Sequence, residues 1–397
     1  MEIIKGMKSR GKKIMIWILI VLLVVIGSGA GVFIYTTDQQ VNKLFKYIQT
    51  ASTTTAVVAY TYDDAGEPVM DDSTLFYNAD TSLVLASTMK VVVLAAYENA
   101  VLLNLLDPKE QVKLTDVEKY YLPKTDGGAH IQGLASLGIP VDTLGFASDP
   151  SATILLDDIA RIMIHYSGNA ETDYLIDRIG LEQVNAIHDM TSQTVIRPVL
   201  GPALAITNHE NNLFVSKSMG EIVEQVNQGD FSYLDHLVDL YLHNPEWRSL
   251  QIDYMRSDAY IASANQLGWA GQVKASQLFP RGTAREYAHM MAKIASGQFV
   301  SKEVSVRMQK KLESAPGDQL LRTLFFKRYG AKDGVTAGIL NISSYCMPKW
   351  GRLNGQDRVV VILTNELPYD MWLSGMQSLS LYLLQAKLAR GSFVFSE

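Results

Sequence analysis

Ser87-Thr88-Met89-Lys90 is the segment that most restricts how this chain folds. The apolar run after it, Val91 to Ala96, lacks Gly and Pro, so the sequence predicts a buried helix that begins near Ser87. Residues three apart share one helix face, which places the Ser87 hydroxyl beside the Lys90 amine. The helix N-terminus also offers unpaired N–H groups and a positive dipole end to an oxyanion at Ser87. This arrangement is typical of acyl transfer through a serine nucleophile.

The S-x-x-K spacing alone is a weak signal, because it also occurs at Ser9-Arg10-Gly11-Lys12. The order of later segments makes it specific. Ser167-Gly168-Asn169 and then Lys332-Asp333-Gly334 follow it, and they resemble the second and third motifs of serine β-lactamases and penicillin-binding proteins. Taken singly, each is an ordinary turn sequence. An earlier copy of the third pattern, Lys124-Thr125-Asp126-Gly127, precedes the second motif and is discounted.

The resemblance to class A β-lactamases extends over most of residues 51–397. Besides the three motifs, similar segments occur in the usual order: Tyr120-Tyr121-Leu122-Pro123 and the run from Gly282 through Thr283-Ala284-Arg285-Glu286 to Gly297. The resemblance implies a β-lactamase/transpeptidase-like α+β fold. It also implies a β-lactam or a peptidoglycan-like small molecule as the substrate.

The strand and helix patterns agree with that fold. Residues 56–62 and 359–364 are rich in β-branched side chains and predict strands near both ends of the chain, with Gly338 to Cys346 as a further strand. Met371 to Arg390 has helical spacing. Strands at both ends with helices between them predict one antiparallel sheet with flanking helices and an all-helical lobe inserted between its strands.

The resemblance implies a role for each site residue. Ser87 attacks a carbonyl, and Lys90, kept neutral by burial and by nearby positive charge, is the general base. Ser167 relays a proton to the leaving nitrogen, and Asn169 holds Lys90 and the substrate amide. Lys332 places positive charge beside Ser167.

The backbone N–H groups of Ser87 and Val335 are the expected oxyanion hole. Gly334 and Thr336 complete the expected substrate-binding segment.

Two departures from the family pattern affect what can be expected. Asp333 stands where a hydroxyl residue usually receives the substrate carboxylate, so either Asp333 points elsewhere and Thr336 supplies the hydroxyl, or the substrate is not the usual anion. Class A enzymes also use a deacylating glutamate shortly before the segment that matches Gly282-Thr283, yet residues 262–279 contain no acidic residue. Glu210 and Glu246 are alternatives without support from spacing. Slow hydrolysis of an acyl-enzyme is therefore expected.

Between Asn169 and Gly282 lie 112 residues, which predicts an insertion within 192–280. Its His243-Asn244-Pro245-Glu246-Trp247 segment indicates either the lining of a substrate cleft or a helix pair on the surface. Thr283 and Glu286 form a capping box at the start of a core helix.

The N-terminus predicts a membrane anchor. Ile14 to Tyr35 is a stretch of 22 residues without charge, preceded by five Lys or Arg residues, so we expect a transmembrane helix with a cytoplasmic N-terminus and a catalytic domain outside the cytoplasm. A cleaved signal peptide is the alternative, but its apolar core is usually shorter and no A-x-A-like cleavage site is seen here. The expected organisation is a cytoplasmic tail over 1–13, an anchor over 14–35, a stalk or first amphipathic helix over 36–50 and the hydrolase domain over 51–397.

Composition excludes several other classes. A net charge of −6 and the lack of a basic stripe argue against nucleic-acid binding. The single cysteine, Cys346, permits no intramolecular disulfide and is expected to be buried. The seven histidines show no metal-ligand spacing, so neither a metal nor a cofactor is expected, and His165 is expected to be a packing residue.

Three functions follow from these observations. The first is a membrane-anchored serine hydrolase that is acylated at Ser87 by a β-lactam or a related amide or ester. The second is a D,D-carboxypeptidase acting on peptidoglycan stem peptides, which Gly168 favours. The third is a non-catalytic binding module on the same fold, for which Asp333 and the missing glutamate argue.

Overall fold

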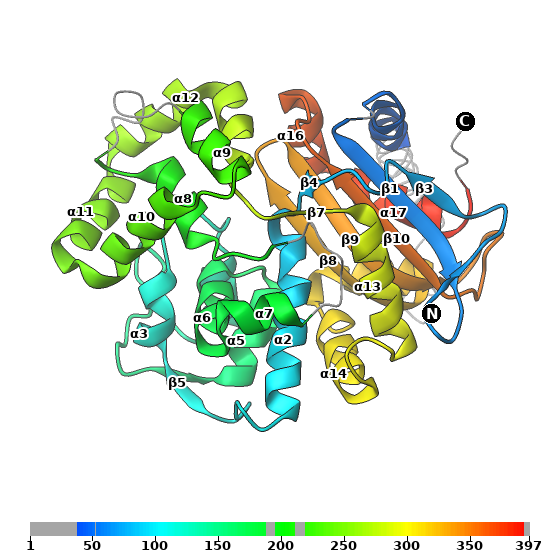
Figure 1. The fold of residues 1–397 in the computed structure, drawn as a ribbon, viewed down its shortest axis with the longest axis horizontal. Coiled ribbons are helices and arrows are strands. Elements are labelled where there is room, and N and C mark those ends of the chain that lie inside the picture. The colour runs from blue at the N-terminus through cyan, green and yellow to red at the C-terminus, as the bar shows by residue number, and fades with distance from the viewer. Residues whose placement is uncertain (1–37, 52, 188–194, 211–218, 393–397) are drawn as a thin grey trace, which may run out of the picture.

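The computed structural model describes residues 38–51, 53–187, 195–210 and 219–392. Its centre is an antiparallel sheet in the order β2 (Pro68–Val69), β1 (Thr55–Tyr62), β10 (Arg358–Thr364), β9 (Ile339–Pro348) and β8 (Phe326–Thr336) (Figure 1). A short strand, β3 (Leu75–Tyr77), also pairs with β1. The first long strand and the last one lie side by side, from Thr55 opposite Thr364 to Thr61 opposite Arg358. The prediction of an antiparallel sheet built from both ends of the chain is confirmed.

Helices cover both faces of this sheet (Figure 1). One face packs against α13 (Ala284–Ser296), and the same apolar core includes α2 (Lys90–Leu102), α5 (Leu156–His165), α6 (Asn169–Ile179) and α14 (Lys302–Leu312). The other face packs against α16 (Tyr369–Gln377) and α17 (Ser380–Ala389). The expected α+β architecture, with a sheet between two helical layers, is therefore present.

Residues 38–50, expected as a stalk or a first amphipathic helix, are helical. Val41, Leu44 and Ile48 recur at helical spacing and are fully or almost fully buried in the core on the α17 side of the sheet. The segment therefore belongs to the folded domain and is not a free stalk.

Five helices form a lobe with its own apolar core: α8 (Leu200–Thr207), α9 (Met219–Asn227), α10 (Ser232–His243), α11 (Pro245–Arg256) and α12 (Asp258–Ser276). Figure 1 shows this lobe in green to yellow beside the sheet. The Asn244 side chain caps α11 by accepting the N–H of Trp247 at 3.1 Å. Trp247 is buried against Tyr241 and His209. The segment 243–247 therefore joins a packed helix pair, and Trp247 does not line a cleft.

The remaining elements are short. Two small ribbons pair β4 (Leu83–Val84) with β7 (Arg281–Gly282) and β5 (Gln111–Lys113) with β6 (Thr153–Leu155). The short helices are η2 (Ala86–Met89), α3 (Leu114–Val117), η3 (Glu118–Tyr120), α4 (Ala129–Ser136), α7 (Leu181–Ala186), η4 (Pro316–Asp318) and α15 (Gln319–Phe325).

Local details agree with several predictions. The Thr283 hydroxyl accepts the N–H of Glu286 at 3.2 Å and caps α13, whose apolar stripe is buried. Cys346 is buried on β9.

The described part of the chain contains no helix that is both long and apolar enough to cross a membrane, and no group of metal-ligand residues. The predicted anchor, Ile14 to Tyr35, lies outside the described residues, and so does the second S-x-x-K sequence, which begins at Ser9.

Candidate active site

Ser87 lies on a tight elbow between β4 and α2. The residue before it, Ala86, has a backbone φ of 48°, which is uncommon for a residue with a side chain and marks local strain. Neighbouring strands hold the elbow: the Leu85 N–H donates to the Pro280 carbonyl at 2.9 Å, and the buried Asn341 amide donates to the carbonyls of Val84 and Leu85 at 2.8 and 3.2 Å. The predicted helix start is thus a fixed 3₁₀ turn that leads into α2, with Ser87 half-buried.

The Lys90 amine connects the first two motifs. Its Nζ atom lies 3.1 Å from Ser87 Oγ, 3.3 Å from Ser167 Oγ and 2.8 Å from Asn169 Oδ1, and it also contacts the Ser167 carbonyl oxygen. Lys90 is fully buried. The structure therefore brings together four of the predicted site residues around one nitrogen atom.

The electrostatic surroundings favour a neutral amine at Lys90. Burial, together with the positive charge of Lys332, lowers the pKa of Lys90 to about 7, although Asp126, Asp173 and Glu171 act in the opposite direction. A neutral amine donates to the Ser167 carbonyl and to Asn169 Oδ1, and its lone pair accepts the proton of the Ser87 hydroxyl. This is the geometry that a general base requires.

Acylation of Ser87 is expected to depend on pH through Lys90. A general base at Lys90 acts as the neutral amine, so we expect the acylation rate to fall about tenfold per pH unit below about pH 7 and to level off above it. The measurement is the rate of adduct formation with a fluorescent fluorophosphonate between about pH 5 and 9, with circular dichroism to confirm the fold at each pH. A rate independent of pH across this range would contradict the assignment.

The second motif forms the turn between α5 and α6. Ser167 has a φ of 74°, and Asn169 is the first residue of α6. This geometry presents both side chains to Lys90. His165, at the end of α5, hydrogen-bonds through Nε2 to the Lys311 carbonyl at 3.0 Å and is a packing residue, as the sequence predicted.

The third motif lies on β8, the edge strand of the sheet next to the elbow. A side chain on Gly334 would point at the elbow, because a Cβ there would lie 2.5 Å from the Leu85 carbonyl oxygen and 3.0 Å from the Ser87 nitrogen. Val335 follows and is partly exposed, and the Thr336 carbonyl accepts the indole N–H of Trp372 at 2.8 Å. The strand therefore packs closely against the backbone of the proposed nucleophile.

The charge of Lys332, which the sequence predicted beside Ser167, acts on the Lys90 amine. The Lys332 Nζ atom also hydrogen-bonds to its neighbour Asp333, at 2.9 Å from Oδ1 and 3.1 Å from the carbonyl oxygen. The other Asp333 oxygen accepts the Tyr382 hydroxyl at 3.0 Å. Burial raises the pKa of Asp333, but the Lys332 charge and these hydrogen bonds outweigh burial and keep it below its ordinary value. Asp333 thus turns toward α17, and its charge offsets that of Lys332.

Residues 37–275 match a family model described as the beta-lactamase enzyme family. The chain belongs to this family. No curated protein sequence matches it.

Solved structures similar to this beta-lactamase-family chain include three of low sequence identity. A point mutant of PBP-A, an acyl-enzyme complex with penicillin G, is 16% identical over 90% of this chain and 95% of that one, with a TM-score of 0.49. The β-lactamase of Sphaerobacter thermophilus DSM 20745 is 16% identical over 90% and 95%, with a TM-score of 0.46. The TLA-1 extended-spectrum β-lactamase is 11% identical over 90% and 98%, with a TM-score of 0.48. Likeness at this level carries no information on the substrate.

The carboxylates near Lys90 in this beta-lactamase-family site are committed to structural bonds. Asp126 accepts the N–H groups of Gly128 and His130, and Asp173 accepts those of Val199 and Leu200. The third, Glu171, is fully buried and pairs with the His130 ring. Glu210 and Glu246, the sequence alternatives, are exposed in the helical lobe. Of these three carboxylates only Asp126 is partly exposed to solvent, and each of its oxygens already accepts a backbone N–H group.

His130, Glu171 and Asp173 lie at the site but were not predicted from the sequence. Glu171 and Asp173 lie two and four residues after Asn169, so acidic residues in the first turns of the helix that follows the second motif were the available signal. His130 comes from α4, and nothing in the sequence indicates that it pairs with Glu171.

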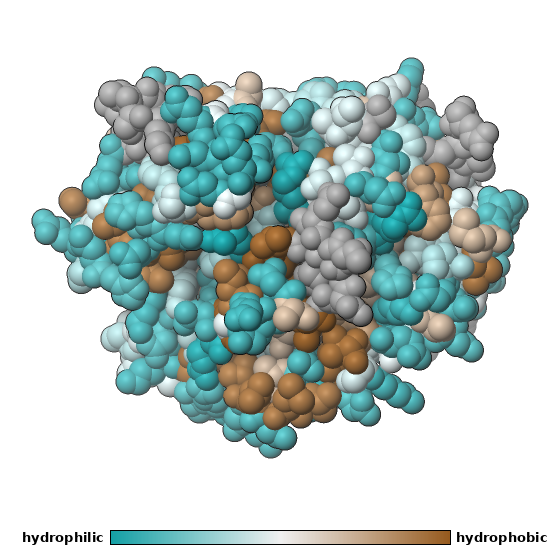
Figure 2. All heavy atoms as spheres, in the orientation of Figure 1, coloured by the Kyte–Doolittle hydropathy of each residue, from teal (hydrophilic) through white to brown (hydrophobic). Residues whose placement is uncertain are grey.

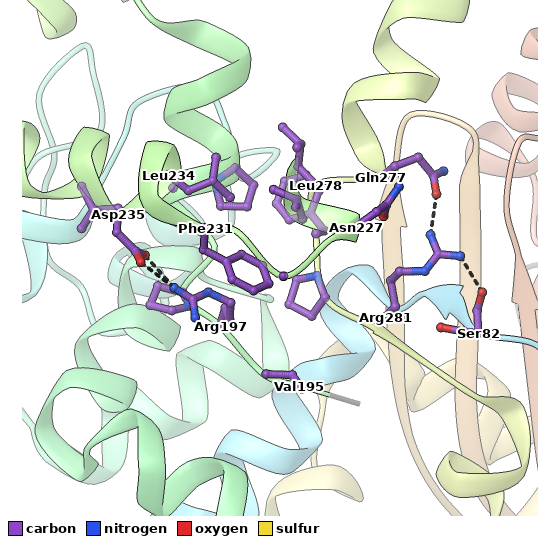
Figure 3. Close-up of a pocket in the computed structure, with 18 residues that line it drawn as sticks. Ser82, Val195, Arg197, Asn227, Phe231, Leu234, Asp235, Gln277, Leu278 and Arg281 are labelled. Carbon is purple, nitrogen blue, oxygen red and sulfur yellow. Dashed lines mark hydrogen bonds and ion pairs between the residues drawn. The ribbon is translucent and has the colours of Figure 1, made fainter. Parts of the chain in front are cut away.

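An apolar pocket of about 540 Å³ lies between the helical lobe and β7 (Figure 3). Arg197, paired with Asp235, and Arg281, bonded to Gln277 and Ser82, lie on opposite sides of it, with Phe231 and Leu278 between them. Figure 2, which has the orientation of Figure 1, shows apolar side chains at the centre of the face that is turned toward the viewer. Among the described residues, none of the predicted site residues lines this pocket, but the carbonyl of Pro280, which does line it, accepts the Leu85 N–H of the elbow.

Proposed function

We propose that the protein is a serine hydrolase of the β-lactamase type that forms an acyl-enzyme at Ser87. The observation that carries the proposal is the Lys90 amine, which lies within hydrogen-bond distance of Ser87, Ser167 and Asn169 and has a pKa near neutrality. The family match favours this function over a D,D-carboxypeptidase or a non-catalytic binding module.

The acylation step uses the groups as follows. Lys90 takes the proton of the Ser87 hydroxyl, and the oxygen attacks the carbonyl carbon of the donor to give a tetrahedral oxyanion. The N–H groups of Ser87 and Val335 stabilise this oxyanion. The proton then passes through Ser167 to the leaving nitrogen or oxygen, and the bond from the carbonyl carbon to that atom breaks. Asn169 holds the Lys90 amine in position during both proton transfers.

The ion pair of Lys332 with Asp333 bears on the choice of acyl donor. The family resemblance implies a hydroxyl residue at position 333 that receives the substrate carboxylate, whereas here Asp333 pairs with Lys332 and offsets its positive charge. We infer that the site accepts uncharged amides or esters as well as anionic β-lactams.

An adduct assay tests this function. The protein is incubated with an anionic fluorescent penicillin, which acylates a serine by opening of its β-lactam C–N bond, or with an uncharged fluorophosphonate, which phosphonylates a serine with loss of fluoride, and intact mass is measured. We expect both donors to label the protein at Ser87, Ser87→Ala to lose the adduct, and Ser148→Ala, a change at an exposed serine, to retain it. Absence of an adduct with every donor would contradict the function. Among the described residues, the one partly exposed carboxylate that acts on Lys90 is Asp126, and it already accepts two backbone N–H groups, so we expect the penicillin adduct to persist for many minutes.

We further propose that Ile14 to Tyr35 anchors the protein in a membrane, with the hydrolase domain outside the cytoplasm. The support is the length of the uncharged stretch and the positive residues before it. The full chain is expected to stay with membranes in alkaline carbonate, and a chain that begins at residue 38 is expected to be released. Release of the full chain would contradict the proposal.

A further inference from the structure

Gly168 is a glycine because another side chain occupies the space beside it. Its torsion angles, φ −58° and ψ 128°, are open to any residue. A Cβ at this position, however, would lie 1.9 Å from Glu171 Oε2, 2.7 Å from Glu171 Cδ and 3.3 Å from an Ile162 methyl group. The Glu171 carboxylate therefore fills the volume of a side chain in the middle of the Ser167–Asn169 turn.

Glu171 has little freedom to move away. It is fully buried, and its Oε1 atom lies 2.6 Å from Nδ1 of His130, which is also fully buried. Nε2 of His130 lies 3.5 Å from Glu118, whose carboxylate accepts the Ala147 N–H at 2.6 Å. The Glu171 carboxylate is thus held from behind by a chain of buried polar groups.

The second oxygen of Glu171 is unusual. Oε2, the atom beside Gly168, is buried without a hydrogen-bond partner, and such an atom calls for an explanation because its desolvation is not compensated. Four titratable groups act on Lys90: Lys332 from β8, Asp126 from the turn before α4, and Glu171 and Asp173 from α6. Burial raises the pKa of Asp173 to about 7, so this group titrates in the same range as Lys90. Asp126 and Asp173 each accept two backbone N–H groups, so Glu171 is the acid in this set with an uncompensated oxygen.

We propose that Glu171, held by His130, is a positioning residue for the reaction: its carboxylate supports the Ser167–Asn169 turn from within and supplies negative charge to the Lys90 site. This inference rests on the proposed function. It requires two things. The residue at position 168 must be small because Glu171 occupies the space beside it, and the negative charge of Glu171 must raise the pKa of Lys90.

The first test is a double-mutant cycle on the acylation rate. Gly168→Ala in the natural chain is expected to lower the rate at least 100-fold, because the added methyl group displaces the turn. In a Glu171→Ala background, which opens the space, the same change is expected to cost less than about fivefold. Gly317→Ala, at a glycine with open space around it, is the control. Equal losses in both backgrounds would overturn the inference.

The second test separates charge from shape. Glu171→Gln keeps the size of the side chain but removes a negative charge that favours the Lys90 ammonium. The same change lowers the pKa of His130, and loss of positive charge there offsets part of the effect, so the pH profile of acylation is expected to move to lower pH by up to about half a unit. Glu182→Gln, an exposed change on α7, is expected to leave the profile unchanged. An unshifted profile in Glu171→Gln would show that Glu171 only fills space, and it would overturn the proposal that its charge acts on Lys90.

Two readouts do not require catalysis and keep this inference separate from the proposed function. Burial favours neutral His130, but the facing carboxylates of Glu171 and Glu118 raise its pKa to about 10, so its imidazole NMR signals are expected to show a protonated ring at pH 8 that Glu171→Gln converts toward the neutral form. The Gly168 and Glu171 cycle is also measured by thermal unfolding, where the same non-additivity is expected. If Ser87 takes no adduct, the proposed function fails, and these readouts still decide whether Glu171 supports the turn. A neutral His130 in the natural chain, or additive unfolding effects, would overturn the inference.

Discussion

Lys90→Met is expected to reduce acylation of Ser87 by about 1,000-fold, within the range of a lost general base. Methionine fills similar space in the buried site but cannot accept the Ser87 proton, and it leaves the Ser167 carbonyl and Asn169 Oδ1 without their donor. The measurement is the rate of fluorophosphonate labelling, with Lys327→Met, a change at an exposed lysine on β8, as the control.

The same variant has a second expected effect, on the pH dependence of stability. The pKa of Lys90 is about 7 in the folded chain and 10.5 for an unperturbed lysine, so between these values the unfolded state binds more protons. The free energy of unfolding of the natural chain therefore rises with pH across this window, by up to about 1.4 kcal/mol per unit from this one group. Lys90→Met is expected to lose that part of the slope, measured by urea unfolding at several pH values. An unchanged slope would show that Lys90 is an ordinary ammonium group, and a retained acylation rate would remove it from the mechanism.

The position of Lys90 was predictable because it follows from local geometry. The spacing of three residues and the apolar run after Lys90 fix its neighbour and its burial before any tertiary contact forms. The terminal strands were predictable for a similar reason, since their β-branched runs leave few alternatives. The second motif was recognised from its order along the chain, and the structure brings Ser167 and Asn169 to the Lys90 amine.

The parts that the sequence did not predict depend on contacts between distant residues. The sequence left open whether Asp333 points away from the substrate, and in the structure its carboxylate binds the Lys332 amine and the hydroxyl of Tyr382, 49 positions after Asp333. Gly168 is typical of a turn in the sequence, yet the reason for it is a carboxylate that His130 holds from another helix. Neither arrangement follows from spacing or propensity, because each is decided by which side chain already occupies the space.

Gly334→Ala is expected to lower acylation at least 100-fold while the fold persists. A Cβ at this position would lie 2.5 Å from the Leu85 carbonyl oxygen, 2.9 Å from the Thr88 nitrogen and 3.0 Å from the Ser87 nitrogen. All three are backbone atoms, so no side-chain rotation relieves the overlap, and either β8 or the elbow must move.

Movement of either element separates the Ser87 N–H from that of Val335, which are the two proposed oxyanion donors, and such a loss is expected to act on the chemical step. The overpacking is also expected to cost about 1–3 kcal/mol of stability, which lowers the melting temperature. The measurement is the acylation rate together with thermal unfolding, with Gly317→Ala as the matched control because its added methyl group meets open space. A Gly334→Ala chain that is acylated at the natural rate would mean that β8 does not form one wall of the reaction site, and the oxyanion role of Val335 would fall with it.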